Sequence, residues 1–377
     1  MKVLHISHDF SGSKVHGNLY KALDAEGINQ VVYTYFDDEK YNGRNQFEAP
    51  HTEIVYSKAL NKYDKFIYHY KIYKLYKDIK NRVSISDIDI IHATTLFSDG
   101  GAAYRLFQKY NIPYVVSVRN TDINLYLKKM RHTWPLCKQI LLNAGKIVFI
   151  SEAHRRRFVS HKYISKFITQ IEDKIVVLPN GIDDFWLNNV IKDRAVESAN
   201  HNLLYVGVYD ENKNVLALMD AVFSLKPKYP DIKLTLVGGK GNLKEIVRTK
   251  AEQSGGMVDF KGQVTDKQVL LDIYRENSIY AMPSHYETFG LVYLEALSQG
   301  LACIYTKGQG IDGMFSDKVG ISVDSRSVDD IAMAIDLIFK KRESFSNIEI
   351  DFGKYRWSVI SQKYIAFYNE ILQSPNH

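Results

Sequence analysis

Short runs of hydrophobic residues alternate along this chain with stretches in which hydrophobic residues recur every three or four positions. Short runs rich in Val and Ile are typical of strands buried on both faces, and the longer period is typical of helices packed on one side. In the first half the pattern predicts strands over 3–7, 30–35, 88–93, 114–118, 146–150 and 174–178. In the second half it predicts strands over 203–208, 233–237, 258–261, 278–282, 302–305 and 320–323. We therefore expect an α/β protein with two doubly wound parallel-sheet domains.

The boundary between the two domains is expected where turn residues end the first series of strands, at Pro179-Asn-Gly-Ile-Asp183. A chain of 377 residues is long enough for two separate cores. Ligand is expected in a cleft where the carboxyl ends of the two sets of strands face each other. The expected division is an N-terminal domain over 1–185, a hinge near 180–200, a C-terminal domain over 200–354, and a last aromatic helix that returns to the first domain with residues 355–377.

The segment from Met282 to Gly300 contains the strongest candidate site. A polar loop that holds Glu287 follows the predicted strand, and Gly290 opens a helical pattern that carries Glu295. A strand that turns through glycine into a helix presents free N–H groups and a positive dipole end, both of which suit a phosphate. Two carboxylates at different depths can then bind hydroxyl-rich groups on either side of a diphosphate. From these residues alone, an ordinary loop-to-helix junction is an equally good interpretation.

A glycine-containing turn follows the first predicted strand. Gly12 lies in this turn, and the next helix is expected from about Asn18. Glycine at this point of an α/β domain lets the backbone approach a ligand closely. The segment has no complete G-x-G-x-x-G pattern, which disfavours a dinucleotide site.

Polar residues also follow two further strands of the first half. His92 ends one strand, and Arg119, Asn120 and Asp122 follow another. Arg119 supplies a planar, positively charged guanidinium group, while Asn120 and Asp122 can bind hydroxyls or cap the next helix. A structural role remains the main alternative for His92 and Asp122.

Charge and composition restrict the partners. The formal charge of +6 suits an anionic ligand or membrane surface, and the absence of a nucleic-acid motif disfavours nucleic acid. The stretch 58–82, expected to be helical, interleaves lysines with tyrosines, which suits an anionic membrane interface, although a solvated helix face explains it equally well. No stretch reaches the ~18 apolar residues of a membrane span. Two cysteines without a partner motif, at 137 and 303, predict a reducing cytosolic compartment.

A metal site is not predicted. Asp87-Ile-Asp89 has the D-x-D pattern, but it leads directly into a predicted strand, and we favour a structural role for it. No other cluster of His, Cys or carboxylate residues has the spacing of metal ligands.

Several motifs occur together in a characteristic order: Glu287-x7-Glu295 within Glu-x-Phe-Gly-Leu…Glu-Ala…Gly, Pro-Asn-Gly-Ile-Asp at 179–183, Tyr-Val-Gly…Lys213-Asn214, Leu236-Val-Gly-Gly, and Phe260-Lys-Gly-Gln-Val264. With these motifs the chain resembles the retaining glycosyltransferases of family 4 over nearly its whole length. The resemblance implies the GT-B fold, in which two Rossmann-like domains face each other across a cleft.

The resemblance also implies roles for individual residues. Glu287 would bind hydroxyls of a donor sugar, Glu295 the ribose of the nucleotide, and Lys213 the diphosphate. The remaining donor-binding residues would be Phe289, Gly290 and Leu291 at the phosphates, Gln263 and Val264 at the base, and Gly12. We take Glu287, Arg119 and Asp122 as candidate catalytic residues, and His92 and Asn120 as acceptor-side residues.

Two positions depart from the family pattern. Val208 stands where family members often have an arginine, so one phosphate-binding cation is missing, and Arg119 or another basic group is a candidate to replace it. Arg119-Asn-Thr-Asp122 replaces the His-Gly-Thr-Asp of many members. The acceptor contact, and any histidine base there, are therefore in question.

The function implied is transfer of a hexose or N-acetylhexosamine from a nucleotide-sugar, UDP-linked by family habit, to a lipid-linked or glycan acceptor. Bacterial cell-surface polysaccharide or glycoconjugate synthesis at the inner face of the plasma membrane is the expected setting, without a metal or other cofactor. Retaining hydrolases need two carboxyl groups about 5 Å apart, whereas one glutamate here lies in a loop and the other in a helix, so two binding roles fit better. The resemblance implies front-face transfer, in which the acceptor hydroxyl attacks on the side that the phosphate leaves. A sugar-nucleotide epimerase of the same architecture and a non-catalytic partner subunit remain alternatives.

Overall fold

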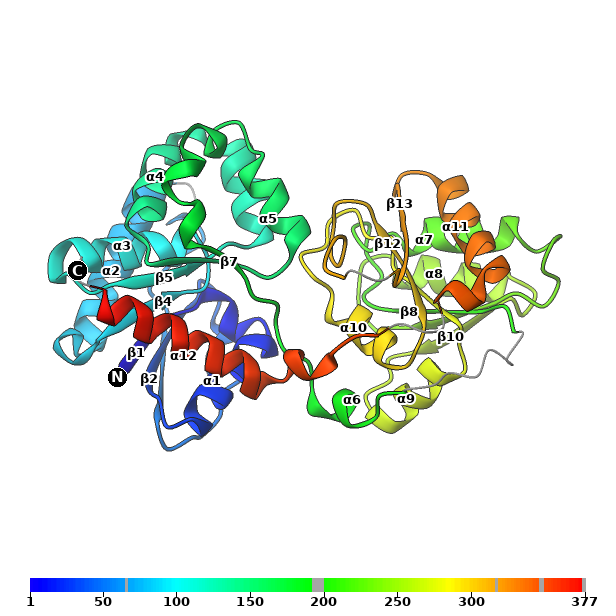
Figure 1. The fold of residues 1–377 in the computed structure, drawn as a ribbon, viewed down its shortest axis with the longest axis horizontal. Helices are drawn as coiled ribbons and strands as arrows, with labels where there is room; N and C mark the ends of the chain where they lie inside the picture. Colours follow the sequence, from blue (N-terminus) through cyan, green and yellow to red (C-terminus); the bar gives the residue numbers. More distant parts are fainter. Residues whose placement is uncertain (65–66, 192–199, 316–317, 346–348, 375–377) are drawn as a thin grey trace. The chain divides into compact units, whose positions relative to one another are not determined.

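The computed structural model describes residues 1–377 except 65–66, 192–199, 316–317, 346–348 and 375–377 (Figure 1). The chain divides into two compact units, each built on its own sheet. Unit 1 contains Met1–Ile150, Arg155–Gly181 and Trp357–His377, and unit 2 contains Ser151–His154 and Ile182–Arg356. The hinge expected near 180–200 includes 192–199, which lie outside the described residues.

The sheet of unit 1 has seven strands in the order β3-β2-β1-β4-β5-β6-β7, and every neighbouring pair is parallel. The strands are β1 Lys2–Ile6, β2 Asn29–Tyr35, β3 Thr52–Ser57, β4 Ile90–Ala93, β5 Tyr114–Ser117, β6 Lys146–Phe149 and β7 Ile175–Val177. The six predicted strands are confirmed, but β3 was not predicted. As an edge strand, β3 is only partly buried, so it lacks the continuous apolar run of the other strands.

Helices cover both faces of this sheet. In β1, Val3 belongs to a core with α1 (Lys14–Ala25) and α12 (Trp357–Gln373), while the next residue, Leu4, belongs to a core with α2 (Tyr68–Arg82), α3 (Ser98–Tyr110) and α4 (Trp134–Asn143). Successive strand residues point to opposite faces, so a strand buried on both sides is mostly apolar along its length. The return of the last helix to the first domain is confirmed, because α12 packs along α1 (Figure 1).

Two expected helix boundaries in unit 1 were wrong. The first helix begins at Lys14 and not near Asn18, because the Ser13 hydroxyl caps it by accepting a hydrogen bond from Val15 N at 3.3 Å. A helix over the whole of 58–82 was expected, but α2 begins only at Tyr68. Before it, Asp64 accepts a hydrogen bond from Asn61 N and closes a turn; residues 65–66 lie outside the described residues.

The sheet of unit 2 has six parallel strands in the order β10-β9-β8-β11-β12-β13, and all six were predicted. They are β8 Asn202–Val206, β9 Lys233–Val237, β10 Val258–Gly262, β11 Ile279–Ala281, β12 Ala302–Thr306 and β13 Gly320–Val323. The helices are α5 Glu152–Val159, which begins in unit 2 and ends in unit 1, followed by α6 Asp184–Asn188, α7 Val215–Ser224, α8 Lys244–Glu252, α9 Lys267–Arg275, α10 Leu291–Ser298 and α11 Val328–Lys340.

The strand order reverses between β1 and β4 in unit 1, and between β8 and β11 in unit 2. In open parallel sheets, ligands bind outside the carboxyl ends of the strands at such a reversal. No helix among the described residues is both long and apolar enough to cross a membrane.

Candidate functional site

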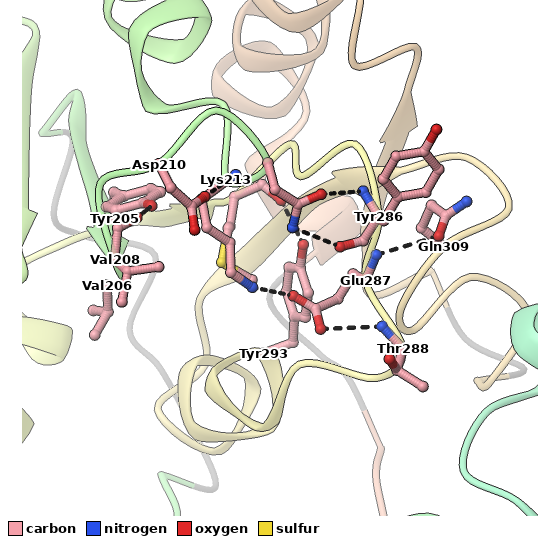
Figure 2. Close-up of polar contacts among 12 residues, drawn as sticks. Tyr205, Val206, Val208, Asp210, Lys213, Tyr286, Glu287, Thr288, Tyr293 and Gln309 are labelled. Carbon is pink, nitrogen blue, oxygen red and sulfur yellow. Dashed lines mark hydrogen bonds and ion pairs between the residues drawn. The ribbon is translucent and has the colours of Figure 1, made fainter. Parts of the chain in front are cut away.

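A lysine and a glutamate meet at the reversal point of unit 2 (Figure 2). Lys213 follows β8 and Glu287 follows β11, and the Lys213 Nζ–Glu287 Oε2 distance is 2.5 Å. Their side chains are only 22% and 13% exposed. Backbone groups hold both residues: Lys213 N donates to Asp210 Oδ1 at 2.8 Å, and Glu287 Oε1 accepts from Thr288 N at 3.1 Å. The pair is therefore held at both residues and largely shielded from water.

Hydrogen bonds hold the loop that carries Glu287 on two sides. The Asn212 side chain bonds both backbone groups of Tyr286, each at 3.0 Å. On the other side, the side-chain oxygen of Gln309 accepts from Glu287 N at 3.2 Å (Figure 2). Gly310 N donates to Glu287 O at 3.0 Å. A loop held by so many hydrogen bonds presents its carboxylate in a defined direction, as a binding site requires.

The start of α10 has the geometry of an anion site. Gly290 has a φ of +79°, and a Cβ atom there would lie 2.7 Å from the Tyr293 ring, so only glycine fits. Tyr293 in turn donates its hydroxyl to Met282 O at 2.6 Å. No side chain caps the helix, and because Tyr293 N donates to Gly290 O at 3.0 Å, the N–H groups of Leu291 and Val292 are the ones available to a ligand. Phe289, by contrast, is buried, and only its backbone can face a ligand.

Glu295 has a different environment from Glu287. Its Oε2 accepts a hydrogen bond from the Tyr274 hydroxyl at 3.1 Å. Burial raises the pKa of Glu295 to about 7, and the hydrogen bond from Tyr274 opposes that rise. One carboxylate is paired with a lysine and the other with a tyrosine, which favours two separate binding roles over a nucleophile–acid pair.

Position 208, where family members often have an arginine, makes a local contact in this chain. Val208 is 36% exposed, and its carbonyl oxygen accepts a hydrogen bond from the Tyr205 hydroxyl at 2.6 Å (Figure 2). Lys213 is thus the cation that the structure places beside Glu287.

A groove of about 630 Å³ lies between α8 and the edge strand β10. Gln263 and Gly239 both line this groove. A side chain at position 239 would clash with Gln263, because a Cβ atom there would lie 2.6 Å from it. Val264, the other residue expected near the base, is partly buried beside it.

In unit 1, Asp122 ties two loops together. Its carboxylate accepts hydrogen bonds from the backbone N–H groups of Leu96, Phe97 and Arg119 at 3.1, 3.1 and 2.8 Å. Burial raises the pKa of Asp122 to about 7, against the effect of these three bonds. Such an arrangement caps backbone donors, so the structure favours the structural role, and a catalytic role for Asp122 stays a prediction.

The other candidates of unit 1 differ in accessibility. His92 is 1% exposed, and its Nδ1 lies 2.8 Å from the hydroxyl of Tyr368 on α12, in the core. Arg119 is partly exposed, and its Nε donates to Thr94 O at 3.1 Å. Asn120 has a buried Oδ1 with no hydrogen-bond partner in the described chain. Gly12 has a φ of −92°, which any residue can adopt. An acceptor-side role for His92 and Asn120 stays a prediction.

The sequence did not identify two buried polar residues near Arg119. Asp99 is fully buried and accepts hydrogen bonds from the hydroxyls of Tyr35 at 2.7 Å and Thr94 at 2.9 Å. His16 is 8% exposed. His16 lies in the first turn of α1, and its place directly before Gly17, soon after the first predicted strand, was the one signal available.

Comparisons with known proteins identify the family of the chain. Residues 13–184 match the model described as Glycosyltransferase Family 4, and residues 190–350 match Glycosyl transferases group 1. A D-inositol 3-phosphate glycosyltransferase of Pseudarthrobacter chlorophenolicus is 25% identical over 280 residues, which are 70% of this chain and 65% of that protein. The chain thus spans slightly less than two thirds of that relative.

Two solved structures show the fold. A sucrose-phosphate synthase from Thermosynechococcus elongatus has a TM-score of 0.72 at 18% identity, over 98% of this chain and 99% of the other. An Anabaena protein in complex with UDP and glucose has a TM-score of 0.66 at 15% identity, over 98% and 100%. The expected GT-B fold of two Rossmann-like domains is confirmed.

Proposed function

Because the chain belongs to the family 4, group 1 glycosyltransferases of the GT-B type, we propose that it transfers a hexose or N-acetylhexosamine from a UDP-sugar, with retention of configuration and without a metal. The acceptor is a lipid-linked or glycan molecule of cell-surface polysaccharide or glycoconjugate synthesis. The UDP and glucose bound to the Anabaena protein support the choice of donor class.

The Lys213–Glu287 pair is the observation that carries this proposal. In the transfer, negative charge develops on the departing diphosphate, and a fixed ammonium group in a water-poor site stabilises that charge strongly. When the donor binds, Lys213 turns its charge to the diphosphate and Glu287 accepts hydrogen bonds from hydroxyls of the sugar. Both side chains already lie at the site, so the ion pair between them is what has to open.

The first turn of α10 and Glu295 complete the donor site. The free N–H groups after Gly290 bind a phosphate oxygen, in place of the cation that Val208 does not supply. Glu295 accepts hydrogen bonds from ribose hydroxyls once it is ionised. Gln263 borders the base at the entrance of the groove beside β10.

The outer face of α2 supports peripheral attachment to the cytoplasmic face of an anionic membrane. The inner stripe of this helix, with Ile72 and Leu75, fills the core, while Tyr70 and Tyr73 on the outer face are 50% and 47% exposed. Exposed lysines, such as Lys77, accompany these tyrosines. Tyrosine rings beside basic groups suit the headgroup region of an anionic bilayer.

The test is a donor screen with purified chain, in which UDP release from UDP-hexoses and UDP-N-acetylhexosamines is measured with membrane extracts as the acceptor source. Glu287→Gln and Lys213→Met are expected to lower kcat about 100-fold or more, the effect of removing one group that stabilises transition-state charge. Glu245→Gln, an exposed glutamate on α8, is the matched control.

Unchanged turnover in Glu287→Gln would refute the donor site. NMR of the product is expected to show the donor's anomeric configuration, and EDTA is expected to leave the rate unchanged. Conversion of the UDP-sugar without any acceptor would identify an epimerase.

A further inference from the structure

Arg119 is held in a fixed direction at the carboxyl end of β5 in unit 1. Its backbone N donates to Asp122 at 2.8 Å, and its Nε donates to the carbonyl oxygen of Thr94, after β4, at 3.1 Å. The two terminal Nη groups have no hydrogen-bond or ion-pair partner in the described part of the chain. A partly buried guanidinium group therefore presents free N–H donors at the reversal point of the sheet.

The groups around Arg119 do not neutralise it. The Asp122 carboxylate is occupied by three backbone N–H groups, and that of Asp99 by two hydroxyls. Burial, reinforced by the charge of Arg119, lowers the pKa of His16 to about 4, although the carboxylate of Asp9 opposes this, so the imidazole is neutral at pH 7. Asn120 adds a buried side-chain oxygen with no partner.

A guanidinium group with two free Nη groups and no ion-pair partner in the described part of the chain matches the planar, two-point geometry of a phosphate or carboxylate. Removing such a charge from water without a partner is costly, and an anionic ligand offsets that cost. The diphosphate of the donor has its own cation, Lys213, and its own helix terminus in unit 2. Arg119 is therefore available for a different anion.

We propose that Arg119, flanked by His16 and Asn120, binds an anionic group of the acceptor, so that the acceptor is a phosphorylated or acidic molecule. This inference rests on the proposed function, because it assigns the second substrate of the same reaction. Neutral His16 accepts a hydrogen bond from a hydroxyl next to the anionic group. A lipid phosphate and a free sugar phosphate offer the same chemistry to Arg119.

The experiment uses the full-length chain with the donor cation removed, as Lys213→Gln, and titrates inorganic phosphate by calorimetry. Adding Arg119→Gln is expected to weaken phosphate binding about tenfold or more, and Arg119→Lys, which keeps the charge but loses the fork, is expected to have an intermediate effect. Equal phosphate binding with and without Arg119→Gln, or no binding in either chain, would overturn the proposal.

A second titration separates this inference from the proposed function. UDP is expected to bind Arg119→Gln within about twofold of the unmodified chain, and to bind Lys213→Gln about tenfold more weakly. If UDP does not bind the unmodified chain, the proposed function fails while the phosphate result stands. If Arg119→Gln weakens UDP as much as Lys213→Gln does, Arg119 serves the donor and the inference is wrong.

Whether the acceptor is a lipid or a soluble molecule follows from comparing the affinity for dihexanoyl phosphatidic acid with that for inorganic phosphate. Tighter, Arg119-dependent binding of the lipid supports a lipid acceptor, and equal Arg119-dependent binding of both supports a soluble phosphorylated acceptor. Thermal unfolding of each variant, measured in parallel, shows whether a lost affinity reflects a lost fold.

Discussion

Replacing Glu295 with glutamine is expected to stabilise the unliganded protein and at the same time weaken nucleotide binding. The carboxyl group lies on α10 among buried residues, with the Tyr274 hydroxyl as its hydrogen-bond donor. A glutamine oxygen can accept the same bond, so the substitution removes the charge while keeping the contact. Functional groups held in unfavourable surroundings commonly cost stability in this way.

The size of the expected change in the free energy of unfolding follows from the pKa of Glu295. Glu295 titrates at about 7 in the folded chain against an ordinary value of 4.5, so its ionised form destabilises the fold by at most about 3 kcal/mol, at about 1.4 kcal/mol per pH unit. Because the side chain is partly exposed, water screens some of this, and we expect about 1–3 kcal/mol. The sign is definite: a raised carboxyl pKa gives stability that is present below pH 4.5 and lost as the pH rises through 7.

The assay is urea unfolding of the unmodified chain and Glu295→Gln at pH 8 and pH 5. Trp186 packs against Tyr274 with ring centroids 5.1 Å apart, so labelling with 5-fluorotryptophan provides a ¹⁹F signal beside the substituted group. We expect Glu295→Gln to be more stable at pH 8 and most of that gain to disappear at pH 5. UDP affinity is expected to fall about tenfold or more, the value of a hydrogen bond to a charged group.

The control is Glu245→Gln, an exposed residue whose substitution should change neither stability nor UDP affinity. Equal or lower stability of Glu295→Gln at pH 8, or a difference that does not depend on pH, would refute the account of Glu295.

Three further predictions concern unit 1. Asp122→Ala leaves three backbone N–H groups without acceptors and is expected to lower the free energy of unfolding by about 3 kcal/mol, with UDP affinity unchanged. A decrease below about 1 kcal/mol, measured by urea unfolding, would contradict the capping role. Burial lowers the pKa of His5 to about 3, so its contribution to stability is complete above pH 6.5 and falls by about 1.4 kcal/mol for each pH unit below. His5→Gln should therefore make the free energy of unfolding in urea less sensitive to acid. An unchanged dependence of that free energy on pH would contradict this. Replacing both Tyr70 and Tyr73 by serine should reduce sedimentation with phosphatidylglycerol vesicles. The control Lys363→Glu, on the exposed face of α12, should not reduce it. Equal sedimentation of the unmodified chain and both variants would exclude α2 as the membrane contact.

The strands and the donor loop were the most predictable parts of this protein. Strands buried on both faces are mostly apolar along their length, so their residues identify them without knowledge of their neighbours. Edge strand β3 has no such requirement and was not predicted. The loop and helix around Glu287 and Gly290 could be predicted because a positive φ and a free helix terminus impose local residue choices.

Charge states and side-chain partners depended on tertiary structure. The sequence by itself determined which carboxylates and which lysine are present, but their pairing and the raised pKa of Glu295 depend on contacts between separate strands and helices. His92 shows the same dependence, because Tyr368, the residue that buries and binds it, lies 276 positions away. Local residue patterns determine secondary structure, whereas desolvation and hydrogen bonding are set by whatever the fold brings alongside a group. For that reason the availability of Arg119 as a free cation is visible only in the folded chain.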